Sequence, residues 1–227
     1  MIQDMNKEAR KKIINSLKSA PGGTASTRPP RPPLHEVSWD RERMIAEFVN
    51  NLQAQTVSAF RVGDYEQASE KLAELLKAEG VRKIIVSADS VIERLNLTEW
   101  GREHHINILR PQDASSREDF KELVFDRAQA GVTGVDFAIA ESGTICLIHN
   151  SKQPRLVSLA PIIHVALLPL ERLFPIYEDA IESIFAANRD KPSQVTFITG
   201  PSMTADIQGV PFKGMHGPKK LFVILIG

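Results

Sequence analysis

Apolar residues recur along the chain with two spacings, which separate the expected helices from the expected strands. Five segments have an apolar residue every three or four positions, as one face of an α-helix requires: 4–19, 40–54, 64–79, 117–130 and 176–188. Asp64 is a suitable N-cap for the third helix, and Gly80 follows its last turn. A shorter helix is expected over 90–95, and the helix over 117–130 is expected to stop at Gly131.

Short runs of apolar and β-branched residues predict strands. Five of these runs are separated by helices or loops: 56–62, 81–87, 105–109, 195–199 and 219–226. Four more follow closely on one another: 135–140, 144–149, 155–160 and 162–170. No crossover helix fits between these four, so we expect antiparallel or mixed strands there. The whole pattern predicts an α/β three-layer domain with a mixed, mostly parallel sheet.

The first helix is separated from the rest of the chain by a segment that suits neither a helix nor a sheet. Residues 21–33 contain five prolines and two glycines. We therefore expect an N-terminal helix over 1–20, a proline-rich linker over 21–38 and an α/β domain over 39–227. Whether the helix docks on its own domain or on a partner stays open.

Composition excludes several classes of protein. The chain of 227 residues has 28 Lys+Arg and 28 Asp+Glu, which argues against nucleic-acid binding through bulk charge. Its one cysteine, Cys146, excludes an intrachain disulfide and any site with four cysteine ligands, such as an iron–sulfur cluster. No apolar run approaches the roughly 20 residues of a membrane span, and no signal-peptide pattern begins the chain. We therefore expect a cytoplasmic protein with no membrane span.

The segment GVTGVDFAIAESGT, residues 131–144, places polar groups at the end of an expected strand. Glu141 lies there on a tight turn with Gly143. A carboxylate at this position can face a crevice and act as a base, a nucleophile or an acceptor for a substrate hydroxyl. An ordinary hairpin turn with a solvated Glu141 fits the same residues. Asp136 lies inside the strand and, when buried, needs a charged or hydrogen-bonding partner.

The segment GPSMTADIQG, residues 200–209, follows another expected strand. Gly200, Ser202 and Thr204 can turn main-chain N–H groups and hydroxyls toward an anion, as in a phosphate or carboxylate cradle. The segment matches neither the P-loop nor the dinucleotide-binding fingerprint. A plain connection from strand to turn fits it as well.

Two histidines, His164 and His216, are candidates for acid–base chemistry. His164 lies inside an apolar run and also suits a core histidine, whereas His216 lies in a loop bordered by glycines. Together with one of the carboxylates above, or with Asp206, they can assemble an acid–base or a metal site. Their spacing requires neither, and no metal site is assigned. His149 is expected at the surface.

The same segments resemble a known family. The stretches GVTGVDFAIAESGTICLI, RLVSLAPIIHVALLP and TGPSMTADIQGVPFKGMHGPKKLFVILI make the chain similar to the lactate-utilisation (LUD) domain family over about residues 40–227. The segment GPSMTADI followed by HGP is specific to that family. The resemblance implies a fold like that of CoA transferases and ribose-phosphate isomerases, preceded by an N-terminal helical extension.

The resemblance also implies which residues form the site. The catalytic candidates are Glu141, His164 and His216. The ligand-binding candidates are Thr133, Asp136, Gly143, Gly200, Ser202, Thr204 and Asp206. Glu141 resembles the nucleophile in the Ser-Glu-Asn-Gly turn of CoA transferases, with Ser142 here in place of the asparagine. Gln208 stands where many relatives have an acidic residue, so no carboxylate role is carried over to that position.

A place in lactate metabolism is what the resemblance implies for function. Members of this kind are encoded beside two iron–sulfur proteins, and the set is needed to oxidise L-lactate to pyruvate. With one cysteine, this chain is expected to hold no cofactor of its own, so the iron–sulfur clusters are expected in partner proteins. The expected ligand is a small anionic metabolite, a carboxylate or an activated carboxylate.

Two other hypotheses stay open. One is a free-standing enzyme, CoA-transferase-like or sugar-phosphate-isomerase-like, that uses Glu141. The other is a metabolite-sensing binding module that signals through the N-terminal helix. The number of copies that associate, a homo-oligomer included, is open too.

Overall fold

The computed structural model describes residues 2–19, 37–185, 192–204 and 212–227. Its contacts form two units, Met1–His35 and Glu36–Gly227, and each is described by itself. Most of the linker expected over 21–38 lies outside the described residues, and so does the ligand-binding candidate Asp206.

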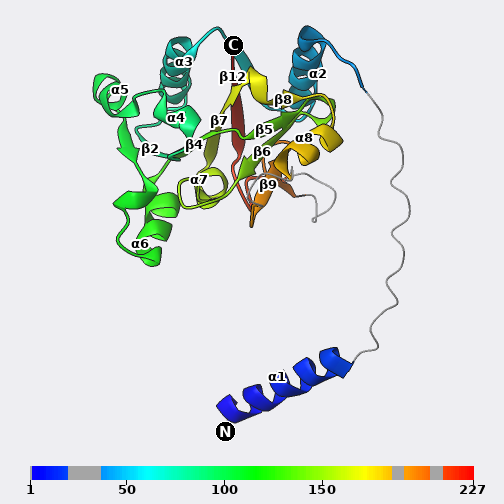
Figure 1. The fold of residues 1–227 in the computed structure, drawn as a ribbon. Helices are drawn as coiled ribbons and strands as arrows, with labels where there is room; N and C mark the ends of the chain where they lie inside the picture. The colour runs from blue at the N-terminus through cyan, green and yellow to red at the C-terminus, as the bar shows by residue number, and fades with distance from the viewer. Residues whose placement is uncertain (1, 20–36, 186–191, 205–211) are drawn as a thin grey trace. The chain divides into compact units, whose positions relative to one another are not determined.

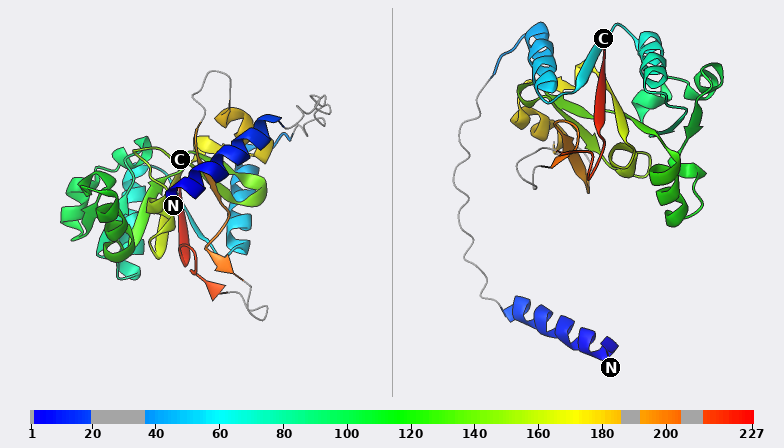
Figure 2. Two further views of the ribbon diagram at one scale, coloured as in Figure 1. Left: turned by 90° about the horizontal axis from the view of Figure 1, so that it is seen from below. Right: turned by 180° about the vertical axis from the view of Figure 1, so that it is seen from behind.

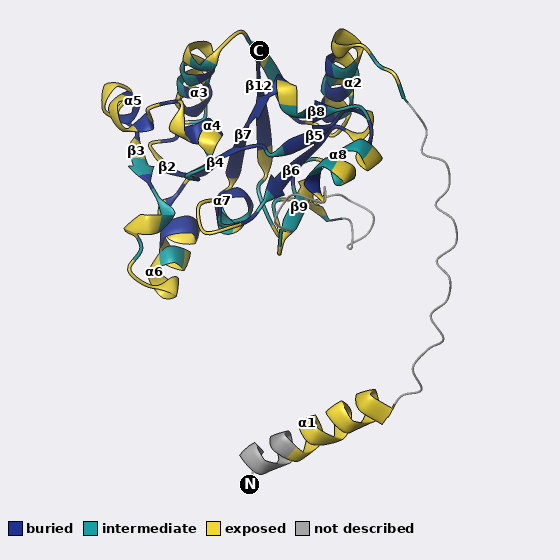
Figure 3. Ribbon diagram, viewed as in Figure 1, coloured by how far each residue is buried: buried dark blue, intermediate teal, exposed yellow. Residues whose placement is uncertain are grey.

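The first unit contains the helix α1 (Ile2–Ser19), at the place where the apolar spacing predicts one (Figure 1). Its described side chains, from Glu8 to Ser19, are all exposed, and they include the apolar Ile13 and Leu17 (Figure 3). Among the described residues, no helix is long and apolar enough to cross a membrane.

A six-stranded parallel sheet forms the centre of the second unit (Figure 1). Its order is β1-β12-β7-β4-β2-β3, and every neighbouring pair runs parallel. The strands are β1 Ser58–Val62, β2 Lys83–Val86, β3 Asn107–Leu109, β4 Ala130–Gly134, β7 Ile163–Pro169 and β12 Lys220–Ile226. β7 is buried along its whole length and β12 at all but its first residue. This burial on both faces explains why their sequences are almost continuously apolar.

Side chains from the two faces of this sheet enter two different apolar clusters. Val165 and Leu167 of β7 pack in one cluster with three helices: α3 (Tyr65–Ala78), α4 (Ser90–Glu93) and α5 (Leu97–Glu103). Ala166 and Leu168, which alternate with them, pack in the other cluster with α2 (Arg41–Ala54) and a smaller sheet. Seen from behind, α2 and α3 lie on either side of β12 (Figure 2). The predicted three-layer, mostly parallel α/β domain is confirmed.

The smaller sheet has the order β8-β5-β6-β9. Its strands are β5 Phe137–Ile139, β6 Thr144–Ile148, β8 Leu173–Phe174 and β9 Val195–Ile198. β5 and β6 form an antiparallel hairpin, β9 adds antiparallel to β6, and β8 adds parallel to β5. The helix α8 (Tyr177–Ile184) packs on this sheet through Ile184, beside the buried Cys146. A short hairpin, β10 (Met203–Thr204) with β11 (Phe212–Lys213), follows β9.

The helix ends confirm the expected capping residues. Asp64 accepts a hydrogen bond from the N–H of Gln67 at 2.8 Å, which satisfies one of the free donors of the first turn of α3. Gly80 follows the same helix at φ +67°, in the left-handed region that glycine adopts without strain.

Two of the four consecutive runs between residues 134 and 170 do not form the strands expected of them. The run 155–160 was expected as a strand, but its centre forms the short helix α7 (Leu156–Leu159). The run 162–170 forms β7, a parallel strand at the centre of the large sheet, rather than part of an antiparallel or mixed cluster. Pro154 and Pro161 bound the first run, and together they favour a single turn over a paired strand.

The prediction of a helix over 117–130 is wrong about where the helix ends. The helix α6 covers Arg117–Glu122, a π-helical turn covers Leu123–Arg127, and Gly131 lies inside β4. Gly131 is needed there because a Cβ atom would lie 1.8 Å from the carbonyl oxygen of Val157. The glycine therefore allows α7 to lie directly on the sheet, and pairing with β2 and β7 overrides the local preference for helix.

We predict that Gly131→Ala lowers the free energy of unfolding by about 2 kcal/mol or more, because the methyl group meets main-chain atoms that cannot rotate away. Gly63→Ala is the matched control, since its Cβ would meet only the Gln67 side chain at 3.5 Å. Urea denaturation of both variants measures the difference. Equal stability of the two variants would contradict the close packing of α7 on β4.

Candidate functional site

A cavity of about 200 Å³ lies at the N-terminal ends of β7 and β12, on the face that carries the smaller sheet. Its polar lining consists of two histidines and four hydroxyl-bearing residues: His164, His216, Ser158, Thr196, Thr199 and Ser202. Leu159, Phe197 and Leu221 are among its apolar walls. Among the described residues of this lining, none is Lys, Arg, Asp or Glu. A ligand in this cavity therefore meets neutral hydrogen-bonding groups and apolar surface.

His164 is the most unusual residue of the cavity wall. It lies at the second position of β7 with 1 % of its surface exposed, and its Nε2 atom lies 2.9 Å from the hydroxyl of Thr133 on β4. Its Nδ1 atom is buried and has no hydrogen-bond partner within the described part of the chain. An unsatisfied buried polar atom costs about 1–3 kcal/mol, so a ligand that pairs with it gains that energy.

Burial also fixes the charge of this ring. Complete burial lowers the pKa of His164 to about 3, because the charged imidazolium has no solvent around it. The ring is therefore neutral at physiological pH, with one nitrogen as donor and the other as acceptor. Because Thr133 can donate or accept, Nδ1 is able to receive a hydrogen bond or to give one, and a hydroxyl or carbonyl oxygen of a ligand suits it.

Hydrogen bonds between two loops bring His216 to the cavity. The N–H of Ser202 donates to the carbonyl oxygen of Pro218 at 2.9 Å, and the hydroxyl of Ser202 accepts from the N–H of His216 at 3.3 Å. Gly217 lies against Ser202, since a Cβ on it would be 3.2 Å from the Cβ of Ser202. Residues 200–204 and the HGP motif therefore meet as one wall, with Gly200, Ser202 and His216 in the lining.

Glu141 lies outside this lining. It is exposed, and its carboxylate accepts a hydrogen bond from the N–H of Tyr177 at 2.8 Å, at the start of α8. The side chain of Asn51 on α2 donates to the carbonyl oxygens of Ala140 and Glu141 at 3.0 and 3.1 Å. Gly143 adopts φ +62° in the same turn, where a Cβ would lie 2.8 Å from Asn51. These contacts tie the turn to two helices, and a catalytic role of Glu141 stays a prediction.

A chain of hydroxyls connects the Glu141 turn to the cavity wall. The hydroxyl of Ser142 donates to that of Thr144 at 2.9 Å, and Thr144 lies 2.9 Å from the hydroxyl of Thr199. Thr199 lines the cavity. The two sequence motifs are therefore neighbours in the fold, although only the second contributes directly to the cavity.

Asp136 lies beyond the C-terminal end of β4 and does not line the cavity. Burial raises the pKa of Asp136 to about 6. A 2.7 Å hydrogen bond from the N–H of Ile148 and the Arg172 guanidinium lower this pKa, while the nearby carboxylate of Asp89 raises it. The site residues expected from the sequence therefore occupy two places in the fold.

The remaining candidates are placed as follows. Thr133 lies behind His164 and orients its ring, whereas Thr204 pairs with Phe212 in the β10–β11 hairpin and lies outside the lining. Among the described residues, no group of three or more His, Cys, Asp or Glu is arranged to hold a metal ion.

Three polar lining residues were not among the candidates from the sequence, and one histidine lies in another place than expected. Ser158 lies in the run 155–160, for which the apolar pattern predicts a strand. Thr196 and Thr199 belong to no motif, and only their position just before the GPSMT segment could have indicated them. His149, expected at the surface, is buried between the carbonyl oxygen of Gln153 at 3.1 Å and the hydroxyl of Thr196 at 2.7 Å. The antiparallel pairing of β9 with β6 brings Thr196 to His149, a contact that no local pattern indicates.

Residues 45–226 match the LUD domain family. The chain is 34% identical over 157 residues to lactate utilization protein C of Anoxybacillus flavithermus, which covers 69% of each chain. It is 28% identical over 223 residues to lactate utilization protein C of Deinococcus radiodurans, which covers 97% of this chain and 96% of that one. The family match extends across both motifs and the cavity.

The fold resembles that of a solved structure. The crystal structure of a DUF162 family protein from Deinococcus radiodurans matches with a TM-score of 0.63 at 23% sequence identity. The match covers 84% of this chain and all of that one. At this identity the likeness concerns the fold alone.

We predict that Asp136→Asn raises the free energy of unfolding by about 1–2 kcal/mol at pH 7.5, and that most of this gain disappears between pH 6 and pH 4. The folded carboxyl has a pKa of about 6 against an ordinary value of 3.8, so the folded state carries a destabilising buried charge only above that window. Asparagine keeps an oxygen to accept from Ile148. Urea denaturation at several pH values measures the change.

The exposed Asp126→Asn serves as the control and is expected to change stability by less than about 0.5 kcal/mol at either pH. A gain at Asp136→Asn that is equal at pH 4 and pH 7.5 would show that the effect does not come from the buried charge.

Proposed function

This chain belongs to the LUD domain family, and we propose from that membership that it serves a lactate-utilisation system as the member that binds a small carboxylate. The proposed system oxidises L-lactate to pyruvate together with iron–sulfur partner proteins. The relatives named lactate utilization protein C support the place in a lactate-utilisation system, and one of them aligns along almost the whole chain.

The observation that carries the proposed ligand is the buried Nδ1 atom of His164, a residue of the cavity lining, which has no hydrogen-bond partner among the described residues. At about 200 Å³, the cavity is smaller than the roughly 300–1,000 Å³ of pockets that take drug-sized ligands, so a small metabolite suits it. A 2-hydroxy or 2-oxo carboxylate presents an oxygen that pairs with neutral His164. Its carboxylate then accepts hydrogen bonds from the hydroxyls of the lining and from His216.

The residues of this chain act in the proposal as a binding and orienting site. Thr133 holds the imidazole through Nε2, which leaves Nδ1 for the ligand. The exposed His216 lies at the other wall, where its ring meets the ligand together with the hydroxyl of Ser202. The apolar wall around Leu159 and Leu221 keeps water from competing for these hydrogen bonds.

The electrons of lactate oxidation need an acceptor outside this chain. Conversion of L-lactate to pyruvate removes two electrons and two protons, and the proposal assigns the electrons to iron–sulfur clusters of the partners. The chain has a single cysteine, and Cys146 is fully buried with its pKa raised to about 12 by burial, so it offers no thiolate for a cluster.

We predict that L-lactate or pyruvate raises the melting temperature of the full chain, because a ligand that binds only the native state stabilises it by mass action. His164→Gln and His216→Ala are each expected to weaken binding at least tenfold, the loss of about one hydrogen bond. Thermal-shift and calorimetric titrations measure both. Because His216 is exposed, its variant reports on binding even where His164→Gln folds poorly.

Glu141→Gln is the matched control, since its carboxylate lies outside the cavity and is expected to leave the affinity unchanged. A screen that finds sugar phosphates as ligands and neither L-lactate nor pyruvate would contradict the proposed ligand. Loss of lactate binding in Glu141→Gln alone would move the site to the turn.

We also predict that affinity purification of the tagged chain from cells grown on L-lactate recovers iron–sulfur proteins, and that deletion of its gene impairs growth on L-lactate but not on glucose. Absorbance near 400 nm and iron analysis of the eluate identify the clusters. Normal growth on L-lactate together with an iron-free eluate would contradict the proposed system.

A further inference from the structure

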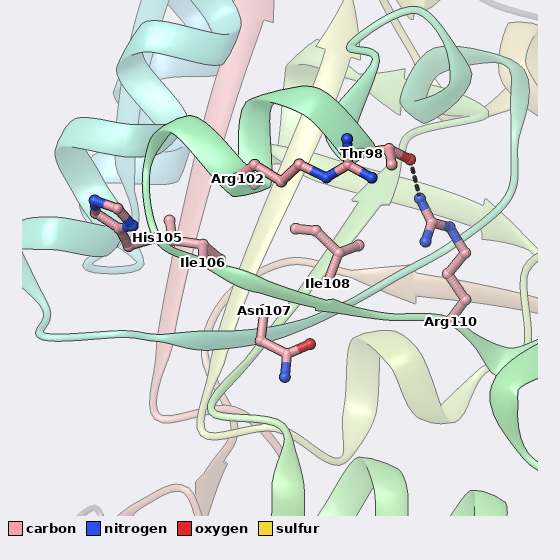
Figure 4. A pocket seen from close by; sticks show the side chains of 8 residues that line it. Thr98, Arg102, His105, Ile106, Asn107, Ile108 and Arg110 are labelled. Carbon is pink, nitrogen blue, oxygen red and sulfur yellow. Dashed lines mark hydrogen bonds between the residues drawn. The ribbon is translucent and has the colours of Figure 1, made fainter.

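A groove of about 470 Å³ lies between α5 and β3, far along the sheet from β7 (Figure 4). Arg102 and Arg110 reach from the two elements toward Thr98, whose hydroxyl accepts a 2.8 Å hydrogen bond from Arg110. His105 and Asn107 also line the groove, and the described residues of the lining include no Asp or Glu. The groove is therefore a concentration of positive charge in a chain whose net charge is +0.

No ion pair among the described residues includes the guanidinium group of Arg102 or Arg110, although four others form there. The carboxylate of Asp113 lies near Arg110, but it accepts a 2.7 Å hydrogen bond from the main-chain N–H. An anionic oxygen placed between the two guanidinium groups is attracted by both. Guanidinium groups bind carboxylates through paired, directional hydrogen bonds, which favours a carboxylate-bearing ligand.

Ile108, which lines the same groove, lies on the edge strand of the sheet. β3 is the last strand in the order and, within the described ranges, pairs with β2 alone. The N–H of Asn107 donates to the carbonyl oxygen of Arg82 at 2.8 Å, and bonding alternates along a parallel ladder. The N–H and C=O of Ile108 therefore face away from β2, and no described residue bonds to them. Such an edge is a template for another extended chain.

We propose that this groove binds an extended acidic segment of a partner protein, which pairs with Ile108 at the edge of β3 and places a carboxylate between Arg102 and Arg110. The open edge supplies direction and main-chain hydrogen bonds, and the arginines supply selectivity for acidic side chains. The inference goes beyond the proposed function, and it does not depend on the ligand of the His164 cavity, because the two sites share no lining residue.

The test uses the full chain and a fluorescent octapeptide of alternating Glu and Thr, followed by fluorescence anisotropy at about 50 mM salt. We expect saturable binding that is at least tenfold weaker for the double variant Arg102→Glu with Arg110→Glu. The matched control, Arg117→Glu with Arg127→Glu, makes the same charge change at two exposed positions outside the groove and is expected to bind within twofold of the parent. If the double Glu variant unfolds, the double variant Arg102→Gln with Arg110→Gln takes its place in the test.

A second peptide separates edge pairing from simple anion binding. N-methylation of its four central residues keeps every charge but removes the main-chain donors, and we expect at least tenfold weaker binding. Equal binding of the methylated peptide, or equal competition by inorganic pyrophosphate at the same charge concentration, would leave an anion site only and overturn the proposal. Equal weakening in the control variant would overturn it as well.

Discussion

A parallel sheet has to be covered on both faces, and this requirement organises the rest of the domain. Val165 and Leu167 of β7 need the helices α3, α4 and α5, while Ala166 and Leu168 need α2 and the smaller sheet. His164 lies two residues before Ala166 on β7, and because side chains alternate along a strand, it points to this second face as well. The cavity lies beside His164. Residues of α7 and β9 line it, and they cover the histidine without filling the space next to it.

Burial of the polar side chains of Thr133 and His164 inside that sheet costs folding free energy. Thr133 and His164 lie two strand positions apart on neighbouring strands, in a register that aligns His164 with Gly131. Gly131 admits α7, and α7 brings Ser158 to the cavity. A core that needed only stability would place apolar side chains here, since buried polar groups cost free energy unless they are paired. The arrangement therefore suits recognition of a ligand oxygen.

Much of this fold follows from the sequence, because helix and strand spacing are local properties. The helices α2, α3 and α8 and the strands β2 and β12 lie where the apolar spacing predicts them. The errors arise where tertiary contacts override local preference, as in α7 and in the end of α6. For the site, the motif around Gly200, Ser202 and His216 and the buried His164 do come together, as the sequence suggests. Glu141 and Asp136 do not join them, since which side of a strand end a carboxylate faces depends on packing that no motif specifies.

The most direct test of the central claim is ¹⁵N NMR of the His164 ring from about pH 5 to pH 8, with and without L-lactate, assigned by comparison with His164→Gln. The account predicts a neutral ring across this range and a change at Nδ1 on addition of ligand, with Nε2, held by Thr133, nearly unchanged. A ring that takes up a proton near pH 6.5, or an Nδ1 signal that saturating L-lactate and pyruvate leave in place, would contradict it.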